Sequence, residues 1–221
     1  MKKMLVIIVI LAMILVSMII YKNIAINKNK SVNVQEVEQI EEYISKIYMW
    51  KEITKEALPT FENINNVNEL WVWEVIKKNL ETYETTYEEI QQKGKELFGE
   101  KFEKQIPKEG NDSFYYDKES NKYLATEIVL DEEEDSFLLK DIEKEGEKYK
   151  VKIIEYIEDY SEENKVIIRN LQEEEIGRVS TSDSETKIKE IVKNNKERFS
   201  QKNIEIKKEK DNLVIEKVNK E

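Results

Sequence analysis

A continuous apolar run near the start of the chain constrains the fold more than any other feature. Lys2 and Lys3 precede residues 4–21, in which Ser17 is the only clearly polar side chain. A helix rises about 1.5 Å per residue, so a run of about 18 residues can cross a hydrocarbon core of roughly 30 Å. The sequence therefore predicts a transmembrane helix that anchors the protein in a membrane.

The apolar run is more typical of an uncleaved anchor than of a cleaved signal peptide. A cleaved signal peptide has an apolar stretch of roughly 7–15 residues followed by a small-x-small site, and the sequence after residue 21 has no such site. We expect residues 1–22 to be a single-pass signal anchor and residues 23–33 to be a polar tether. Lysines flank both ends of the run, so the positive-inside rule does not decide the orientation. The very short N-terminal tail favours the arrangement that places residues 34–221 outside the cytoplasm.

Composition excludes several function classes for the domain that follows. The chain has no Cys and no His, which removes thiol nucleophiles, Cys- or His-ligated metal sites and the Ser-His-Asp triad. The net charge of −11 disfavours nucleic acid as a partner. Eleven Tyr, six Phe and three Trp indicate a packed core rather than disorder. We find no motif with catalytic, metal-binding or cofactor-binding spacing, and we predict no catalytic residue, metal or cofactor.

The first part of the domain, residues 34–99, has helical periodicity. Apolar residues spaced by three and four predict one helix over 34–58, ended by Pro59. Asn68 is a good N-cap, and Thr86 with Glu89 forms a capping box. Further helices are predicted over 68–80, over 86–99 with Gly99 as the C-terminal cap, and over 184–199.

The second part, residues 111–221, is mostly strand-like, with alternating apolar and polar positions. The lack of an internal repeat or a low-complexity linker favours one α+β domain with helices packed on an antiparallel sheet. Strands are predicted over 113–117, 123–130, 136–143, 148–156, 166–171, 176–180, 204–208 and 213–218.

Several of these segments resemble a known family. They are Trp71–Leu80, Tyr87–Gly99, Phe114–Asp117, Ser136–Asp159 and Asn203–Val218. On these segments the chain resembles membrane-anchored proteins of clostridia and related Firmicutes whose ectodomain is similar to the NTF2-like, or cystatin-like, superfamily. The resemblance implies an N-terminal helical layer against a curved antiparallel sheet, in the shape of a cone. It implies no catalytic residues, and it does not decide the function, because the wider superfamily includes enzymes, ligand-binding proteins and interaction modules.

Five aromatic residues are the candidate site for a ligand or a partner: Trp50, Trp71, Trp73, Tyr83 and Tyr87. They could line the mouth of a cone and bind a sugar, a peptide or a lipid fragment. Alternatively, they fill the core between the helices and the sheet. Side chains two positions apart on a helix cannot point the same way, so we expect either Trp71 or Trp73 to be partly exposed.

Two other features suggest a binding partner. The acidic run 131–135 could bind Ca²⁺, but it lacks the spacing of an EF-hand loop, and a solvated loop between two strands explains it better. The apolar stripe of the helix predicted over 34–58 has heptad spacing and could pair with a second copy to form a homodimer. Packing of this helix on its own domain is the simpler alternative.

These observations together favour a non-enzymatic domain that binds a partner at the bacterial cell envelope. A protein partner fits a charged surface with a few exposed aromatic residues better than a small molecule does. The alternative is a small-ligand-binding protein, or an enzyme that uses a carboxylate with a raised pKa inside the cone. That alternative predicts an isolated carboxylate among aromatic side chains.

Overall fold

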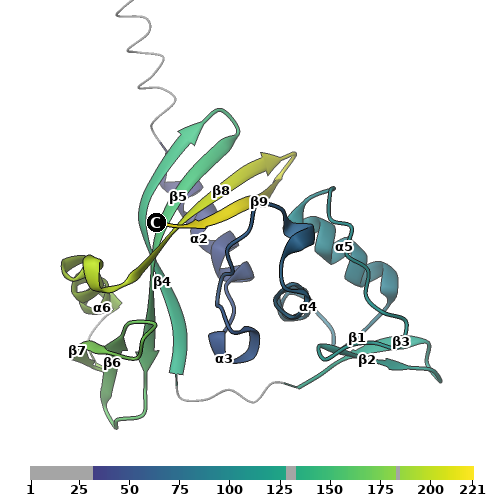
Figure 1. Cartoon of the computed structure of the whole chain (residues 1–221), viewed down its shortest axis with the longest axis horizontal. Coiled ribbons are helices and arrows are strands. Elements are labelled where there is room, and N and C mark those ends of the chain that lie inside the picture. Colours follow the sequence, from purple (N-terminus) through teal and green to yellow (C-terminus); the bar gives the residue numbers. More distant parts are fainter. Residues whose placement is uncertain (1–31, 128–132, 183–184) are drawn as a thin grey trace, which may run out of the picture.

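The computed structural model describes residues 32–127, 133–182 and 185–221 (Figure 1). The predicted membrane anchor lies outside these residues, and within them no helix is long and apolar enough to cross a membrane. The helices are α2 (Val34–Ile47), α3 (Lys51–Thr54), α4 (Glu69–Lys78), α5 (Tyr87–Phe98) and α6 (Glu185–Asn194), with 3-10 turns η1 (Ile64–Asn66) and η2 (Lys196–Arg198). The strands are β1 (Glu84–Thr85), β2 (Phe114–Asp117), β3 (Lys122–Ala125), β4 (Glu133–Glu145), β5 (Lys148–Asp159), β6 (Lys165–Arg169), β7 (Glu175–Ser180), β8 (Ser200–Glu209) and β9 (Asn212–Lys220).

The main sheet has six strands, all of whose pairings are antiparallel, and it is organised around β5. Strand β4 pairs with β5 along its whole length on one side. On the other side, β8 pairs with residues 148–155 and β6 pairs with residues 157–159. The sheet therefore divides into two branches, one continued by β9 and the other by β7. The predicted α+β class with an antiparallel sheet is confirmed.

The two faces of β5 belong to two different hydrophobic cores. Ile153 is buried in the main core beneath α2, α4 and α5, whereas Ile154 is buried in a smaller core that includes Ile188 and Val192 of α6. Consecutive strand residues point to opposite faces, so α6 covers the face of β5 opposite the main helical layer. A separate three-stranded sheet, in the order β1-β3-β2, lies beside α4 and α5 at the other end of the molecule from α6 (Figure 1).

A buried tyrosine joins three elements of the main core. The hydroxyl of Tyr43, on α2, donates to the Leu97 carbonyl oxygen of α5 at 2.7 Å. The same hydroxyl accepts a hydrogen bond from the backbone N–H of Ile215, on β9, at 2.7 Å. Burial raises the pKa of Tyr43, so the hydroxyl stays protonated and serves as both donor and acceptor.

The local signals for helix starts are confirmed. The Asn68 side chain accepts from the Leu70 N–H at 3.0 Å at the start of α4. At the start of α5, the Thr86 hydroxyl accepts from the Glu89 N–H at 3.3 Å and the Glu89 carboxylate accepts from the Thr86 N–H at 2.8 Å, which completes the capping box. Gly99 ends α5 with a φ of 88°.

The prediction of one helix over 34–58 is wrong. Helix α2 ends at Ile47, and Tyr48 and Trp50 adopt extended backbone angles before the short α3 begins. The break lets Tyr48 and Met49 bury their side chains, and the Met49 N–H donates to the Ala57 carbonyl oxygen at 2.9 Å instead of continuing the helix. These tertiary contacts outweigh the helical periodicity of the segment.

Several further boundaries differ from the predictions, and three of them concern segments discussed above. Strand β4 begins at Glu133 rather than at 136, so the last three acids of the run 131–135 belong to a strand, while the first two lie outside the described residues. The strand predicted over 123–130 is β3 up to Ala125, and residues 128–130 are also outside the described part. The helix predicted over 184–199 ends at Asn194 and is followed by η2.

Candidate binding pocket beside the break after α2

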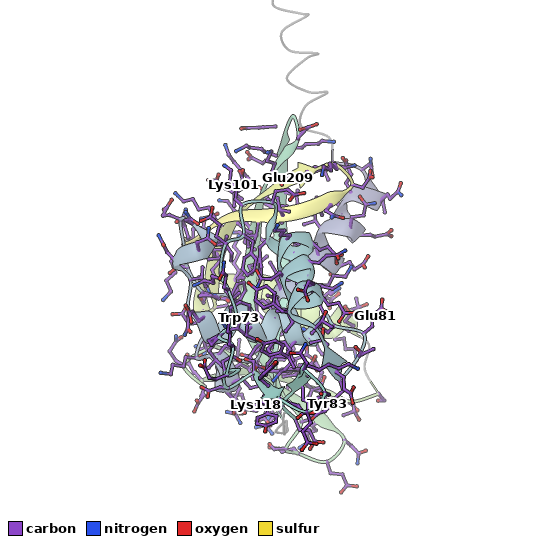
Figure 2. All side chains as sticks on the ribbon, turned by 90° about the vertical axis from the view of Figure 1, so that its right-hand side faces the viewer. Trp73, Glu81, Tyr83, Lys101, Lys118 and Glu209 are labelled. Atoms are coloured by element: carbon purple, nitrogen blue, oxygen red, sulfur yellow. The ribbon has the colours of Figure 1, made fainter. Side chains whose placement is uncertain are left out.

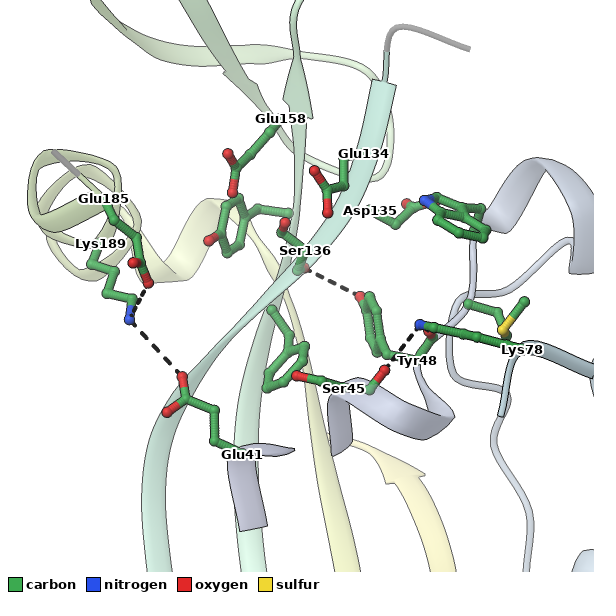
Figure 3. A pocket seen from close by; sticks show the side chains of 14 residues that line it. Glu41, Ser45, Tyr48, Lys78, Glu134, Asp135, Ser136, Glu158, Glu185 and Lys189 are labelled. Carbon is green, nitrogen blue, oxygen red and sulfur yellow. Dashed lines mark hydrogen bonds and ion pairs between the residues drawn. The ribbon is translucent and has the colours of Figure 1, made fainter. Parts of the chain in front are cut away.

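A pocket of about 290 Å³ opens where α2 ends. Its walls come from α2 and the break that follows it, the end of α4, the adjacent strands β4 and β5, and the start of α6 (Figure 3). Larger hollows lie elsewhere on the surface, including one of about 700 Å³ beside η1. The pocket after α2 is the candidate site because a partly buried carboxylate and two aromatic residues from the break converge on it.

The pocket is acidic. Its two lysines are already engaged: Lys189 lies 2.6 Å from Glu185 and 3.9 Å from Glu41, and Lys78 donates to the carbonyl oxygens of Tyr48 at 2.8 Å and Ser45 at 3.0 Å. Carboxylates outnumber these lysines, and they come from α2, β4, β5 and α6: Glu41, Glu134, Asp135, Glu158 and Glu185. The pocket therefore has a net negative charge that favours a cationic ligand.

Asp135 is the carboxylate that lies deepest among the aromatic side chains. Its Oδ2 accepts from the Lys51 N–H at 2.6 Å, while its Oδ1 is buried and has no hydrogen-bond partner among the described residues. Burial raises the pKa of Asp135, because the charged form loses its hydration. A buried carboxylate oxygen without a partner is costly, and a donor from a ligand would remove that cost.

Four aromatic residues line the pocket, and Trp50 and Tyr48 are the two that come from the break after α2. The Lys78 ammonium lies 5.4 Å from the centroid of the Trp50 ring, so this ring already has a cation over its face. The Tyr48 hydroxyl lies 3.3 Å from both the Ser136 carbonyl oxygen and the Glu155 carboxylate. Burial raises the pKa of Tyr48 well above its usual value, so the phenol remains a neutral hydrogen-bond donor.

A buried ion pair lies behind Tyr48. Lys202 on β8 and Glu155 on β5 are 2.9 Å apart, and their side chains are 5% and 1% exposed. The Ser200 hydroxyl donates to the other Glu155 oxygen at 3.1 Å, and the Lys202 ammonium also donates to the Leu58 carbonyl oxygen. This network fixes the Tyr48 hydroxyl at one side of the pocket and connects the break after α2 to the sheet.

The structure separates the five aromatic residues that the sequence grouped. Trp50 is half-buried and lines the pocket, whereas Trp71 and Trp73 are both buried in the main core. The expectation that one of the latter two is partly exposed is therefore wrong, because Phe102 packs against Trp73, with ring centroids 6.2 Å apart. Tyr83 is exposed before β1 (Figure 2). Tyr87 is half-buried at the start of α5.

The sequence did not single out Tyr48, and Asp135 was interpreted only as part of a solvated acidic loop. A signal for Asp135 was present, because Asp135, Phe137 and Leu139 alternate along β4, and the last two pack against the main core. A carboxylate that shares a strand face with apolar residues is a candidate for burial. Tyr48 gave no comparable signal, since it lies inside the segment predicted as one continuous helix.

Among residues 32–127, 133–182 and 185–221, no group of three or more acidic side chains is placed to hold a metal ion. No family model matches the chain, and neither a curated protein nor a solved structure matches it. The assignment of the pocket as a binding site therefore depends on its own geometry and charge.

The raised pKa of Asp135 predicts a pH-dependent effect of Asp135→Asn. The ionised carboxylate destabilises the fold above its folded pKa, and this penalty is absent below the unfolded value of about 3.9. The substitution keeps an oxygen to accept from Lys51 and removes the charge. We expect the unfolding temperature to rise by a few degrees at pH 7 and to change little near pH 3.5, as measured by circular dichroism. The exposed Glu81→Gln is the control, and its unfolding temperature should change little at either pH. If Asp135→Asn had a lower unfolding temperature than the wild type at pH 7, the raised pKa of Asp135 would be contradicted.

Proposed function

We propose that the protein is a non-enzymatic binding domain of the bacterial cell envelope, held on the outer side of the cytoplasmic membrane by residues 4–21. We further propose that the pocket after α2 binds the ammonium group of a lysine side chain on a partner protein. The apolar run and the resemblance to membrane-anchored proteins with NTF2-like ectodomains support the location. The unpartnered Asp135 oxygen, in an acidic pocket with an aromatic wall, is the observation that carries the ligand assignment.

The size and chemistry of the pocket favour a single side chain as its occupant. Pockets for drug-sized molecules span about 300–1,000 Å³, and this pocket, at about 290 Å³, is just below that range. An ammonium group can donate to Asp135 while its methylene stem packs against the Trp50 ring. The neighbouring carboxylates would attract the cation from a distance without being neutralised by it.

The proposal can be tested with a lysine analogue. We expect Nα-acetyl-lysine amide to change the tryptophan fluorescence of the full chain in detergent micelles in a saturable way, and the neutral Nα-acetyl-norleucine amide to have no such effect. Asp135→Asn should weaken binding by about 10–100-fold, because a charge-assisted hydrogen bond contributes roughly 1.5–3 kcal/mol. Trp50→Phe should remove the signal, since the other two tryptophans are buried away from the pocket.

The matched control is Glu81→Gln, which removes one exposed carboxylate far from the pocket and should leave the affinity unchanged (Figure 2). Equal responses to the lysine and norleucine analogues would rule out recognition of the ammonium group. Equal affinities of the wild type and Asp135→Asn would remove Asp135 from the site.

A second candidate function is carboxylate-dependent catalysis in the same pocket. The observation in its favour is the raised pKa of Asp135 beside the neutral Tyr48 hydroxyl, because a carboxyl group with a raised pKa keeps its proton to higher pH and is a better candidate for a general acid. The two proposals differ in the expected effect of Asp135→Asn. Catalysis requires turnover that the variant loses while it still binds its substrate, whereas the binding proposal expects the affinity itself to fall.

A further inference from the structure

The outer edge of strand β4 is open. Strand β4 pairs with β5 on one side, and no other strand of the described residues pairs with its other side. The edge of β9, by contrast, is partly covered, because Phe61 exchanges two backbone hydrogen bonds with Val218, each 2.9 Å long. An open edge presents backbone N–H and C=O groups to which a further strand can pair.

A register shift divides this edge into two parts. The pairing of β4 with β5 shifts between Leu139 and Asp141 and leaves Lys140 without a partner residue. Such an irregularity bends an edge strand and interrupts further pairing, and charges of both signs follow it in β4. Before the shift the pairing is regular from 133 to 139, and Leu138 is the one buried residue of that stretch. A further strand therefore fits along residues 133–139.

The candidate pocket lies beside this same stretch. Its β4 wall consists of residues 134–137 (Figure 3). The pocket is also lined by Glu41 of α2 and by Glu185 of α6, two helices that pack on opposite faces of the sheet. A pocket with walls from both faces lies at the edge of the sheet and not over one face. It therefore opens at the unpaired side of β4.

We propose that the lysine of the partner belongs to an extended segment that adds to the sheet along residues 133–139 of β4. This inference rests on the proposed function and specifies the conformation of the partner. Side chains that lie opposite each other on neighbouring strands share one face of the sheet. A lysine opposite Asp135 would therefore lie on the face where the Asp135 carboxylate accepts from the Lys51 N–H. The residue two positions away would lie opposite Phe137, where an apolar side chain fits.

The charge of the edge favours a cationic partner over a second copy of the chain. Residues 133–139 contain three acids, Glu133, Glu134 and Asp135, and no basic residue. A second copy would bring the same three acids to the contact, and like charges on neighbouring strands repel each other. Backbone hydrogen bonds to the edge would provide affinity, and the acidic pocket would select the lysine.

The test uses the peptide acetyl-Val-Thr-Lys-Thr-Val-amide and the full chain in detergent micelles. We expect calorimetry to show that it binds at least about 10-fold more tightly than Nα-acetyl-lysine amide, because backbone hydrogen bonds are added to the lysine contact. N-methylation of both threonines and N-methylation of the lysine and the last valine block N–H groups on opposite sides of the peptide strand. Only one of these two modified peptides should lose the added affinity.

Hydrogen exchange followed by NMR locates the contact. The parent peptide should slow the exchange of backbone amides within residues 133–139 and leave those of residues 141–145 unchanged. If exchange within 133–139 instead slowed with protein concentration in the absence of peptide, the occupant of the edge would be a second copy, and the proposal would be overturned.

The failure of strand pairing and the failure of lysine recognition give different results. Equal affinities of the peptide and Nα-acetyl-lysine amide, or equal affinities of both N-methylated peptides and the parent, would overturn strand pairing and leave the lysine site intact. If the peptide with norleucine in place of lysine bound as tightly as the parent, strand pairing would be supported and recognition of the ammonium group would be overturned.

Discussion

We expect Lys202→Met to lower the free energy of unfolding by about 3–5 kcal/mol, because it leaves the Glu155 carboxylate buried without its cation. The two side chains are 2.9 Å apart, and each is at most 5% exposed. The Tyr48 and Ser200 hydroxyls that donate to Glu155 do not compensate for the missing positive charge. Denaturant unfolding of the full chain, followed by circular dichroism, measures the effect.

Two further variants serve as controls. One tests the effect of removing both charges of the buried pair, and the other tests the effect of removing an exposed lysine. The double variant Glu155→Gln/Lys202→Met removes both charges, and we expect it to recover a large part of the lost stability. Lys210→Met removes a lysine that is 84% exposed and paired with Glu100, so its cost should be below about 1 kcal/mol. Equal effects of Lys202→Met and Lys210→Met would show that the buried ion pair does not stabilise the fold as we describe.

Trp71→Ala should lower the free energy of unfolding by about 3–5 kcal/mol, the range for truncating a large buried aromatic side chain. Trp71 is fully buried, and its ring lies 6.2 Å from that of Phe61 and 5.7 Å from that of Phe98, between centroids. Its indole N–H donates to the Ala57 carbonyl oxygen at 3.0 Å, and in the variant that oxygen keeps only its hydrogen bond from the Met49 N–H. Thermal and denaturant unfolding both measure this change.

The other predicted aromatic residues provide the comparison. Tyr83→Ala should cost less than about 0.5 kcal/mol, since Tyr83 is exposed. Trp50→Ala should have an intermediate effect on stability, but it should weaken binding of the lysine analogue, because Trp50 lines the pocket. A Trp71→Ala variant as stable as Tyr83→Ala would mean that Trp71 is not part of the core.

Local chemistry in the sequence predicted the helix starts, whereas it did not predict the break after α2. The Asn68 cap and the Thr86 capping box depend on groups within three positions of one another, so short-range patterns contain them. The break depends on Tyr48, whose hydroxyl contacts a Glu155 oxygen 107 positions away in the sequence. A sequence pattern within one helix or strand cannot predict a contact between residues so far apart in the sequence.

The charged residues of the buried network and the pocket were missed for a related reason. Asp135 and Lys202 both lie just before the alternating apolar positions of their strands. A charged residue at such a position is normally interpreted as lying outside the strand, before its first residue. In the structure β4 and β8 both begin earlier and include these residues. Lys202 alternates with the buried Ile204 and Ile206, which places its ammonium on the core side of the sheet.

The most direct measurement is a crystal structure of the protein soaked with Nα-acetyl-lysine amide. The proposed function predicts the ligand ammonium within hydrogen-bond distance of Asp135 Oδ1, with its methylene stem against the Trp50 ring. A ligand bound elsewhere on the surface would contradict the claim that this pocket binds a lysine side chain. The claim would equally fail if the pocket stayed without the ligand while Asp135 paired with Lys78.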